Sequence, residues 1–380
     1  MKITNIVLKN WRNFKHVSVP LSEFTYIVGP NSCGKSNFLD VFRFLRDLCK
    51  PSGGGLQYAI NSRGGLKKIR CLAATNVTDI EITLEIEDTI DNSNIEKWKY
   101  SLVFNNGPTG EVVLKKELVE KNNKVILNRP NISDNDDRKL LTQTFIESVL
   151  TNNGFRKLAD FFSDTLYLHL IPQLLKYGDS FAYTKSDSDP FGQNFLEKLS
   201  KTQERTRNSR LKRINEIISK NIPSLGQLSF ERDNVNGKPH LLMNFKHWRA
   251  HGNYQREDQF SDGTLRIIAL LWTLMESNDI ILLEEPELSL HDDIVRQIPK
   301  MIYDSKKSSK KSGGQIFIST HSREILENND IVGGFVIITP ISDGKNGSDI
   351  IVPSESDNKL MQHGMSPAEV LLPKTYPKGM

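Results

Sequence analysis

Cysteine is scarce in this sequence, and long apolar runs are missing from it. Only Cys33, Cys49 and Cys71 occur among its 380 residues, without the spacing of a disulfide framework or a zinc site. This excludes a secreted fold built on disulfides. No run of about 18 apolar residues is present, so we expect no membrane span and no membrane partner. The first residues, MKITNIVLKNWRNF, lack the apolar segment of a signal peptide, and we expect a cytoplasmic protein.

Charge of one sign is not in large excess either. The formal net charge is +4, which permits contact with nucleic acid but does not by itself argue for it. Apolar residues make up 37% and charged residues 25%, so a chain of this length can bury a substantial core. The length predicts two or three domains, or one domain with a large insertion.

The order of the expected elements is that of an α/β protein. Alternating residues at 78–87 and 99–104 predict antiparallel strands in the first third. A middle segment has helical periodicity, and the last third returns to alternating helices and strands. We therefore expect an N-terminal lobe at 1–137, a helical insertion at 138–222 and a C-terminal lobe at 223–380.

Residues 29–36, GPNSCGKS, match the phosphate-binding pattern GxxxxGK[ST] between an expected strand and an expected helix. Glycines let backbone N–H groups turn toward phosphate oxygens, and the helix N-terminus adds partial positive charge. Lys35 should reach the β- and γ-phosphates of ATP, and the Ser36 hydroxyl should bind Mg²⁺. Cys33 is interpreted as a small filler and not as a reactive thiol. The residues expected to contact the nucleotide in this segment are Gly29, Asn31, Ser32, Cys33, Gly34, Lys35, Ser36 and Asn37.

Two adjacent carboxylates follow an apolar strand in residues 280–287, IILLEEPE. Four consecutive apolar residues indicate a buried parallel strand, and ligands bind at the carboxyl ends of such strands. Glu284 is expected to hold Mg²⁺ through water. Glu285 is expected to polarise the attacking water as the general base.

Four further segments extend these two motifs. They are a Trp-Arg turn at 10–14, a signature-like loop at 260–264, a D-loop-like segment at 288–291 and a strand before a histidine at 315–322. In this order the segments resemble the ABC-ATPase superfamily, in its soluble SMC-, RecF- and OLD-like branch, and not the ring-forming AAA+ proteins. The resemblance implies an ABC-ATPase head with a P-loop core sheet, an antiparallel β subdomain and a helical insertion.

The resemblance also implies roles for residues outside the two motifs. Arg12 should lie near the nucleotide, and Ser261 and Gly263 should close on the γ-phosphate held by a second subunit. His321 should donate to charge that develops at the γ-phosphate. The alternative for His321 is a capping or core histidine.

Two positions fit the family pattern less closely. The family usually has Asp where Glu284 stands, and the extra methylene predicts a different metal geometry. The Q-loop can be placed at Gln57, which has the better spacing, or at 63–65, where Arg-Gly-Gly also fits this branch.

One copy of each motif implies a partner copy. In the resembled family the phosphate loop and the signature loop of one head are too far apart to meet on one ATP, so we expect a two-fold homodimer closed over ATP. The heptads of a long SMC arm are absent, and no Toprim nuclease is expected after residue 322. We expect an ATPase that gates a separately encoded effector, such as a nuclease, in a prokaryotic antiphage system. The alternative is a stand-alone RecF-like repair ATPase that binds DNA and loads other proteins.

Two segments carry open alternatives. The expected helix at 203–218 has a basic face that is either solvated or contacts phosphates. The apolar run Val370-Leu371-Leu372 in the tail 365–380 either packs on its own head or, with the insertion, contacts the effector.

Overall fold

A six-stranded, mostly parallel sheet forms the centre of the molecule. The computed structural model describes residues 1–91, 94–108, 110–178, 189–221, 225–245, 254–276, 278–307, 314–328, 331–340 and 347–376. The strand order of the central sheet is β15-β14-β3-β13-β12-β8, in which β15 alone is antiparallel to its neighbour. The strands are β3 (Phe24–Val28), β8 (Thr165–Leu168), β12 (Ile280–Glu284), β13 (Gln315–Thr320), β14 (Gly334–Thr339) and β15 (Asp349–Ile351).

The alternation of side chains along these strands feeds two separate cores. Phe317 and Leu282 point toward α1 (Lys35–Cys49), whereas Ile318 and Leu283 belong to a second core with α9 (Asp262–Leu274) and α11 (Ile298–Lys307). Because strands buried on both faces favour apolar residues at every position, IILL is continuous and FTYIV is interrupted only by the buried hydroxyl of Thr25.

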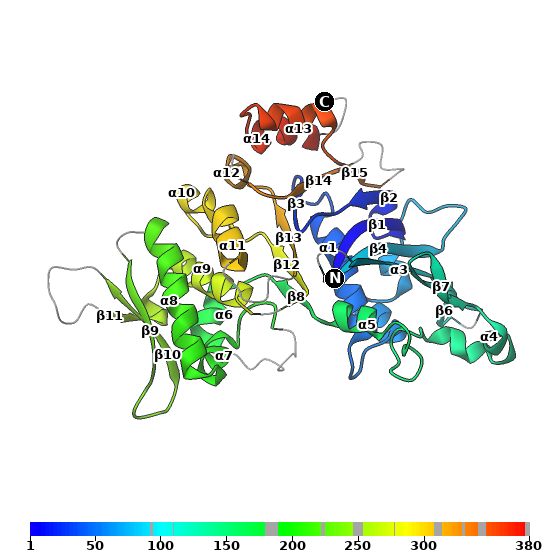
Figure 1. The fold of residues 1–380 in the computed structure, drawn as a ribbon, viewed down its shortest axis with the longest axis horizontal. Coiled ribbons are helices and arrows are strands. Elements are labelled where there is room, and N and C mark those ends of the chain that lie inside the picture. Colours follow the sequence, from blue (N-terminus) through cyan, green and yellow to red (C-terminus); the bar gives the residue numbers. More distant parts are fainter. Residues whose placement is uncertain are drawn as a thin grey trace.

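A second sheet covers the other side of α1 and forms the predicted antiparallel β subdomain. Its order is β2-β1-β4-β5-β6-β7. Helix α1 is therefore buried on two sides. Phe42 stacks on Phe317 with 4.4 Å between ring centroids, and Phe44 stacks on Phe104 with 5.6 Å between ring centroids. Figure 1 shows α1 between the central strands and this subdomain. The strands are β1 (Lys2–Trp11), β2 (Phe14–Pro20), β4 (Ile80–Asp91), β5 (Asn94–Asn106), β6 (Val112–Lys121) and β7 (Lys124–Arg129).

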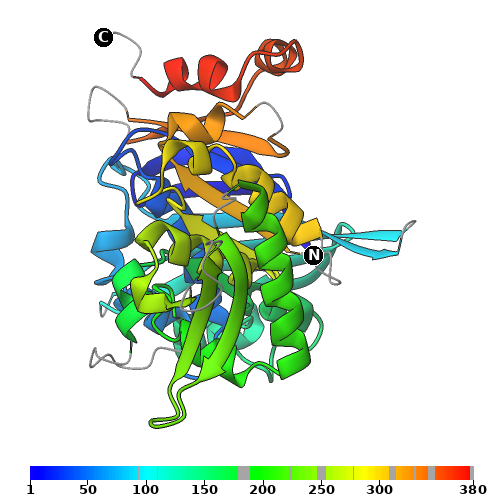
Figure 2. The same ribbon diagram turned by 90° about the vertical axis from the view of Figure 1, so that its left-hand side faces the viewer.

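The segment predicted as a helical insertion, 138–222, does not form a separate unit. Its strand β8 is an edge of the central sheet, and its helix α5 (Arg156–Ser163) packs on α1. Only its later part is a helical layer, which packs on α9 and on a small sheet of β9 (Leu225–Arg232), β10 (Pro239–Phe245) and β11 (Tyr254–Arg256). Figure 2 shows this sheet beside α8. The helices of this layer are α6 (Pro172–Tyr177), α7 (Phe195–Lys201) and α8 (Glu204–Asn221).

Shorter elements complete the chain. A short helix, α10 (Asp292–Val295), precedes α11. No helix in the described ranges is both long and apolar enough to span a membrane. The remaining elements are α2 (Leu56–Asn61), α3 (Leu66–Ile69), α4 (Ile132–Asp136), η1 (Arg138–Thr142), η3 (Glu257–Gln259), α12 (Arg323–Leu326), α13 (Glu355–Gln362), α14 (Pro367–Leu371) and η4 (Leu372–Thr375).

The tail packs on its own head. Val370 and Leu371 in α14 are buried in the core that also contains Phe335 and Ile337 of β14. This decides between the two alternatives for this apolar run, because side chains that fill the core are not free to dock elsewhere. Residues 377–380 of the predicted tail lie outside the described residues.

Candidate functional site

The phosphate-binding loop connects β3 to α1, as predicted. Its two glycines are required by close contacts: a Cβ on Gly29 would lie 2.5 Å from the Ile338 carbonyl oxygen, and one on Gly34 would lie 2.1 Å from Asn13 Nδ2. Gly34 also has a φ of 114° and Ser32 a φ of 63°, in the left-handed region. The loop is therefore shaped by backbone conformations that few other residues adopt.

Asn13 holds the phosphate-binding loop by side-chain hydrogen bonds, and it is not among the predicted site residues. Its Nδ2 donates to the Cys33 carbonyl at 2.8 Å, and its Oδ1 accepts from Asn37 Nδ2 at 2.9 Å. Ser348 Oγ donates to the same Cys33 carbonyl at 2.7 Å. Cys33 itself is buried, and burial raises the pKa of its thiol, which agrees with a filler residue.

The start of α1 offers donors to an anion. Gly34 is the N-cap, and no side chain caps the helix, so the first N–H groups of α1 have no partner within the helix. Lys35 Nζ donates to the carbonyls of Gly29 and Pro30 at 3.0 and 3.1 Å, and lies 3.9 Å from Glu285 Oε1. Asn31 and Ser32 are exposed in the loop. This donor set fits a triphosphate, since uncapped helix N–H groups and an ammonium favour phosphate oxygens.

Ser36 and Glu284 lie in contact, as expected for two residues that share a metal ion. Ser36 Oγ donates to Glu284 Oε1, and Tyr167 of β8 donates its hydroxyl to Glu284 Oε2. A hydroxyl and a carboxylate are the hard oxygen ligands that Mg²⁺ prefers. Burial first, and the bond to Glu284 second, raise the pKa of Tyr167, so its hydroxyl remains a donor at neutral pH. Tyr167 was not predicted, because it comes from a strand that the sequence pattern did not reveal.

The structure also brings Glu285 and His321 together. His321 Nδ1 lies 3.0 Å from Glu285 Oε1 and 3.9 Å from Glu287 Oε1. Glu285 has a φ of 45°, which turns the chain directly after the strand. Glu287 is buried and accepts from Thr320 Oγ1 at 2.6 Å, and burial raises the pKa of its carboxyl. Side chains from the ends of two parallel strands thus converge beside Lys35.

The signature-like loop caps α9. Ser261 Oγ accepts from the Thr264 N–H at 3.1 Å, and a Cβ on Gly263 would lie 2.7 Å from Leu290 Cδ2. Buried Arg266 donates to the carbonyls of Leu288 and Glu285 at 2.7 and 3.1 Å. The signature helix is therefore fastened to the loop that carries Glu285. The contact of Ser261 and Gly263 with a second subunit stays a prediction.

An arginine-rich pocket of about 430 Å³ borders Ser36 and Asn37. Arg12 Nη2 and Arg63 Nη2 lie 2.7 and 3.0 Å from the carboxylate of Asp40. Burial alone would raise the pKa of Asp40, but Arg63 and Arg12 together hold it below its usual value. The pocket is also lined by Arg43, Arg46, Asp47, Tyr58 and Ser62.

Of the two Q-loop candidates, only Arg63 lies at this pocket. Gln57 Nε2 donates to the carbonyls of Val112 and Thr142, both at 2.8 Å, and so binds the edge of the β subdomain. The structure does not bring Gln57 together with the other predicted nucleotide residues. Spacing along the chain favoured Gln57, whereas the turn after α2 places Arg63 in the pocket that Ser36 also lines.

Other predicted features have structural roles. His291 Nδ1 accepts from the Asp293 N–H at 3.4 Å, so His291 caps α10. On the basic helix α8, the Arg207 guanidinium carbon lies 4.0 Å from the centroid of the Phe230 ring. Arg210 Nη1 lies 3.8 Å from Glu276 Oε1, and the Arg210 guanidinium lies over the Trp272 ring. These two arginines contact groups within the head, whereas Arg205 and Lys212 of the same helix are exposed, so both interpretations of this face remain open.

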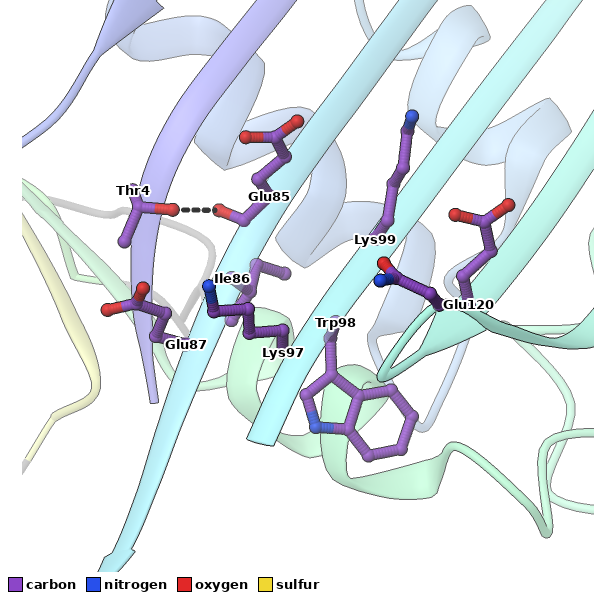
Figure 3. Close-up of a pocket in the computed structure, with 9 residues that line it drawn as sticks. Thr4, Glu85, Ile86, Glu87, Lys97, Trp98, Lys99 and Glu120 are labelled. Atoms are coloured by element: carbon purple, nitrogen blue, oxygen red, sulfur yellow. Dashed lines mark hydrogen bonds between the residues drawn. The ribbon is translucent and has the colours of Figure 1, made fainter. Parts of the chain in front are cut away.

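A second pocket, of about 290 Å³, lies on the outer surface of the β subdomain. Figure 3 shows Glu85 and Glu87 of β4 beside Lys97 and Lys99 of β5, with Trp98 also among the lining residues. Three glutamates and two lysines are among its lining residues, which include none of the predicted site residues.

A phosphate loop, an acidic pair and a histidine at the ends of neighbouring parallel strands, with a signature-like loop on α9, define the head of an ABC-type ATPase. The chain belongs to the family described as "AAA domain, putative AbiEii toxin, Type IV TA system", which matches residues 24–327. The predicted resemblance to the SMC-like branch is confirmed at the level of fold by the similar solved structures.

Two of these structures are SMC heads in complex with ScpA. The SmcHead bound to the C-winged helix domain of ScpA has a TM-score of 0.58 and 17% identity, over 94% of this chain and 100% of that chain. An Smc head with an extended coiled coil, bound to the C-terminal domain of ScpA and derived from Pyrococcus furiosus, has a TM-score of 0.52 and 14% identity, over 95% and 99%.

One curated relative matches a short part of the chain. Endonuclease GajA of Bacillus cereus (strain VD045) is 35% identical over 81 residues, which are 21% of this chain and 14% of GajA. The match therefore covers a small fraction of the length of GajA.

The placement of Arg63 and Gln57 generates a prediction. Arg63→Ala should weaken binding of a fluorescent ATP analogue about tenfold, because it removes a charged donor from the pocket that borders Ser36 and leaves Asp40 without one of its arginine partners. Gln57→Ala should leave that affinity within about twofold and lower the melting temperature, since it removes two hydrogen bonds to the β subdomain. The reverse pattern would return the Q-loop to Gln57.

Proposed function

We propose that this head binds Mg-ATP and hydrolyses it to ADP and phosphate. The observation that carries the proposal is the convergence of Lys35, Ser36, Glu284, Glu285 and His321 at the carboxyl ends of β3, β12 and β13. These are the cation, hydroxyl, metal-binding carboxylate and base that phosphoryl transfer to water needs. The family match and the SMC-head fold support it.

The chain's own groups account for each part of the reaction. Lys35 would leave the carbonyls of Gly29 and Pro30 and donate to the β- and γ-phosphates, and a bound Mg²⁺ between Ser36 and Glu284 would neutralise further phosphate charge. Glu285 would accept a proton from water as the water oxygen bonds to the γ-phosphorus and the β–γ bridging bond breaks. His321, already hydrogen-bonded to Glu285, would orient that carboxylate and donate to the γ-phosphate oxygens.

We also propose that two copies close head to tail over ATP. Ser261 and Thr264 are at least partly accessible at the start of α9, and in the proposed dimer the first turn of this helix would meet a phosphate held by the other molecule. Arg266 would transmit that contact to the Glu285 loop. A two-fold homodimer would then complete two sites at once.

The biological role we propose is ATP-dependent control of a separately encoded effector, such as a nuclease, in prokaryotic antiphage defence. Three similarities support this role: the family carries the description of a toxin, the curated relative is an endonuclease, and the SMC heads were solved bound to ScpA. The DNA-binding alternative would use the exposed cations of α8, such as Arg205 and Lys212, because Arg207 and Arg210 contact groups of the head itself.

Lys35→Ala tests the nucleotide site. We expect binding of a fluorescent ATP analogue to weaken at least about tenfold, because a charged donor to the phosphates is lost. The melting temperature without nucleotide should stay close to that of wild type. Wild-type affinity in this variant would remove the site assignment.

Glu285→Gln tests the base and the dimer together. Turnover should fall about a hundredfold or more, because a general base is lost while the Ser36–Glu284 pair survives. Light scattering should then show a dimer with Mg-ATP and a monomer without it, since ATP forms part of the interface. Adding Ser261→Arg should keep the ATP-bound variant monomeric. Unchanged turnover would place the base elsewhere, and a monomer in both states would contradict the closed pair.

The effector proposal has its own test. The Glu285→Gln variant, co-expressed with the product of the adjacent gene, should co-elute with it in Mg-ATP at least several times more than in ADP, because a ligand shifts binding only by its difference between states. Deleting residues 366–380 or 140–220 is unsuitable here, since both segments contain core residues. DNA cleavage by this chain alone, or no partner in either nucleotide, would favour the stand-alone repair ATPase.

A further inference from the structure

We infer that Tyr167 is a positioning residue for Glu284 and that the two form a matched pair, in which the tyrosine hydroxyl holds one carboxylate oxygen while the other faces Ser36. The inference rests on the proposed function, because it concerns how the proposed metal-binding carboxylate is oriented. Neither the motifs nor the family description identifies Tyr167.

The carboxylate of Glu284 is held by two hydroxyl groups. Its two oxygens have different partners, Ser36 Oγ on Oε1 and the Tyr167 hydroxyl on Oε2. Tyr167 lies in β8 and Glu284 in β12, and these strands pair in parallel with Leu283 opposite Leu168. The tyrosine therefore reaches Glu284 from the neighbouring strand. A donor on one oxygen fixes the plane of the carboxylate and directs the other oxygen toward the start of α1.

The ring of Tyr167 packs against a side chain of α1. The Arg43 guanidinium lies over the Tyr167 ring at 4.3 Å from its centroid, and Arg43 Nη1 lies 3.9 Å from Asp40 Oδ1. The ring is thus held by α1, the same helix that carries Ser36. Because one rigid helix positions both the ring and Ser36, the two hydroxyls on Glu284 keep a constant relation to each other.

The length of the Glu284 side chain lets its carboxylate reach both hydroxyls. The resembled family usually has Asp at this position, and the additional methylene moves the carboxylate farther from its strand. At that distance it contacts both the α1 hydroxyl and the hydroxyl of the edge strand. Glu284 and Tyr167 therefore act together: a shorter Asp would lose the outer contact while keeping the position on β12.

A double-mutant cycle with a binding readout tests the pair. We would titrate four proteins with Mg²⁺ at a fixed concentration of a fluorescent ATP analogue: wild type, Tyr167→Phe, Glu284→Asp and the double variant. The Mg²⁺ midpoint is the Mg²⁺ concentration at which half of the analogue signal is reached. Tyr167→Phe should raise the midpoint about 10–100-fold when Glu284 is retained, the range for partners of metal ligands. It should change the midpoint by less than about threefold in the Glu284→Asp background, where the contact is already lost. Phe keeps the ring under Arg43, so the melting temperature should change little.

Tyr100→Phe is the matched control. Tyr100 also donates to a glutamate, Glu117 Oε1 at 3.4 Å, but in the β subdomain. The Tyr100→Phe substitution should lower the melting temperature without changing the Mg²⁺ midpoint. The inference is overturned if Tyr167→Phe leaves the midpoint unchanged, or if its effect is equal in both backgrounds. Failure of wild type itself to bind the analogue with Mg²⁺ would instead overturn the proposed function.

Discussion

The burial of α1 between two sheets is the constraint on which the site depends. Phe42 stacks on Phe317 of the central sheet, and Phe44 on Phe104 of the β subdomain, so the helix cannot shift without disturbing two cores. Its N-terminus carries Lys35 and Ser36, and its next turns carry Asp40 and Arg43. The phosphate loop, the arginine pocket and the ring of Tyr167 therefore have fixed positions relative to one helix.

The antiparallel subdomain has a direct part in shaping the nucleotide loop. The turn between β1 and β2 presents Asn13, whose amide group holds the Cys33 carbonyl and accepts from Asn37. The same turn places Arg12 against Asp40. Because β1 pairs with both β2 and β4, the turn is anchored by the subdomain and not by the loop itself. Loss of subdomain packing would thus reach the phosphate loop through Asn13.

The parts of the site that a short contiguous pattern encodes could be predicted, and the parts assembled across strands could not. The loop 29–36 and the pair Glu284–Glu285 each specify their chemistry within eight residues, and the structure places them together. Tyr167 lies in the four-residue strand TLYL, too short for a periodic signal, inside a segment whose periodicity is helical. Spacing alone could not separate Gln57 from Arg63, because the path of the chain through and after α2 places Arg63 in the pocket and directs Gln57 to the β subdomain.

The connection between α9 and the acidic strand explains how one surface can control the chemistry at another. Arg266 is buried and donates to the carbonyls of Leu288 and Glu285, and Gly263 packs against Leu290 without room for a side chain. Of these contacts, one hydrogen bond joins α9 directly to the backbone of Glu285, and the others join it to the following residues of the same loop. His321 Nδ1 lies 3.0 Å from the Glu285 carboxylate, so a displacement of Glu285 would also change this contact. In the proposed dimer, closure by a second head would act on this connection, and the geometry of the base would depend on whether the partner is present.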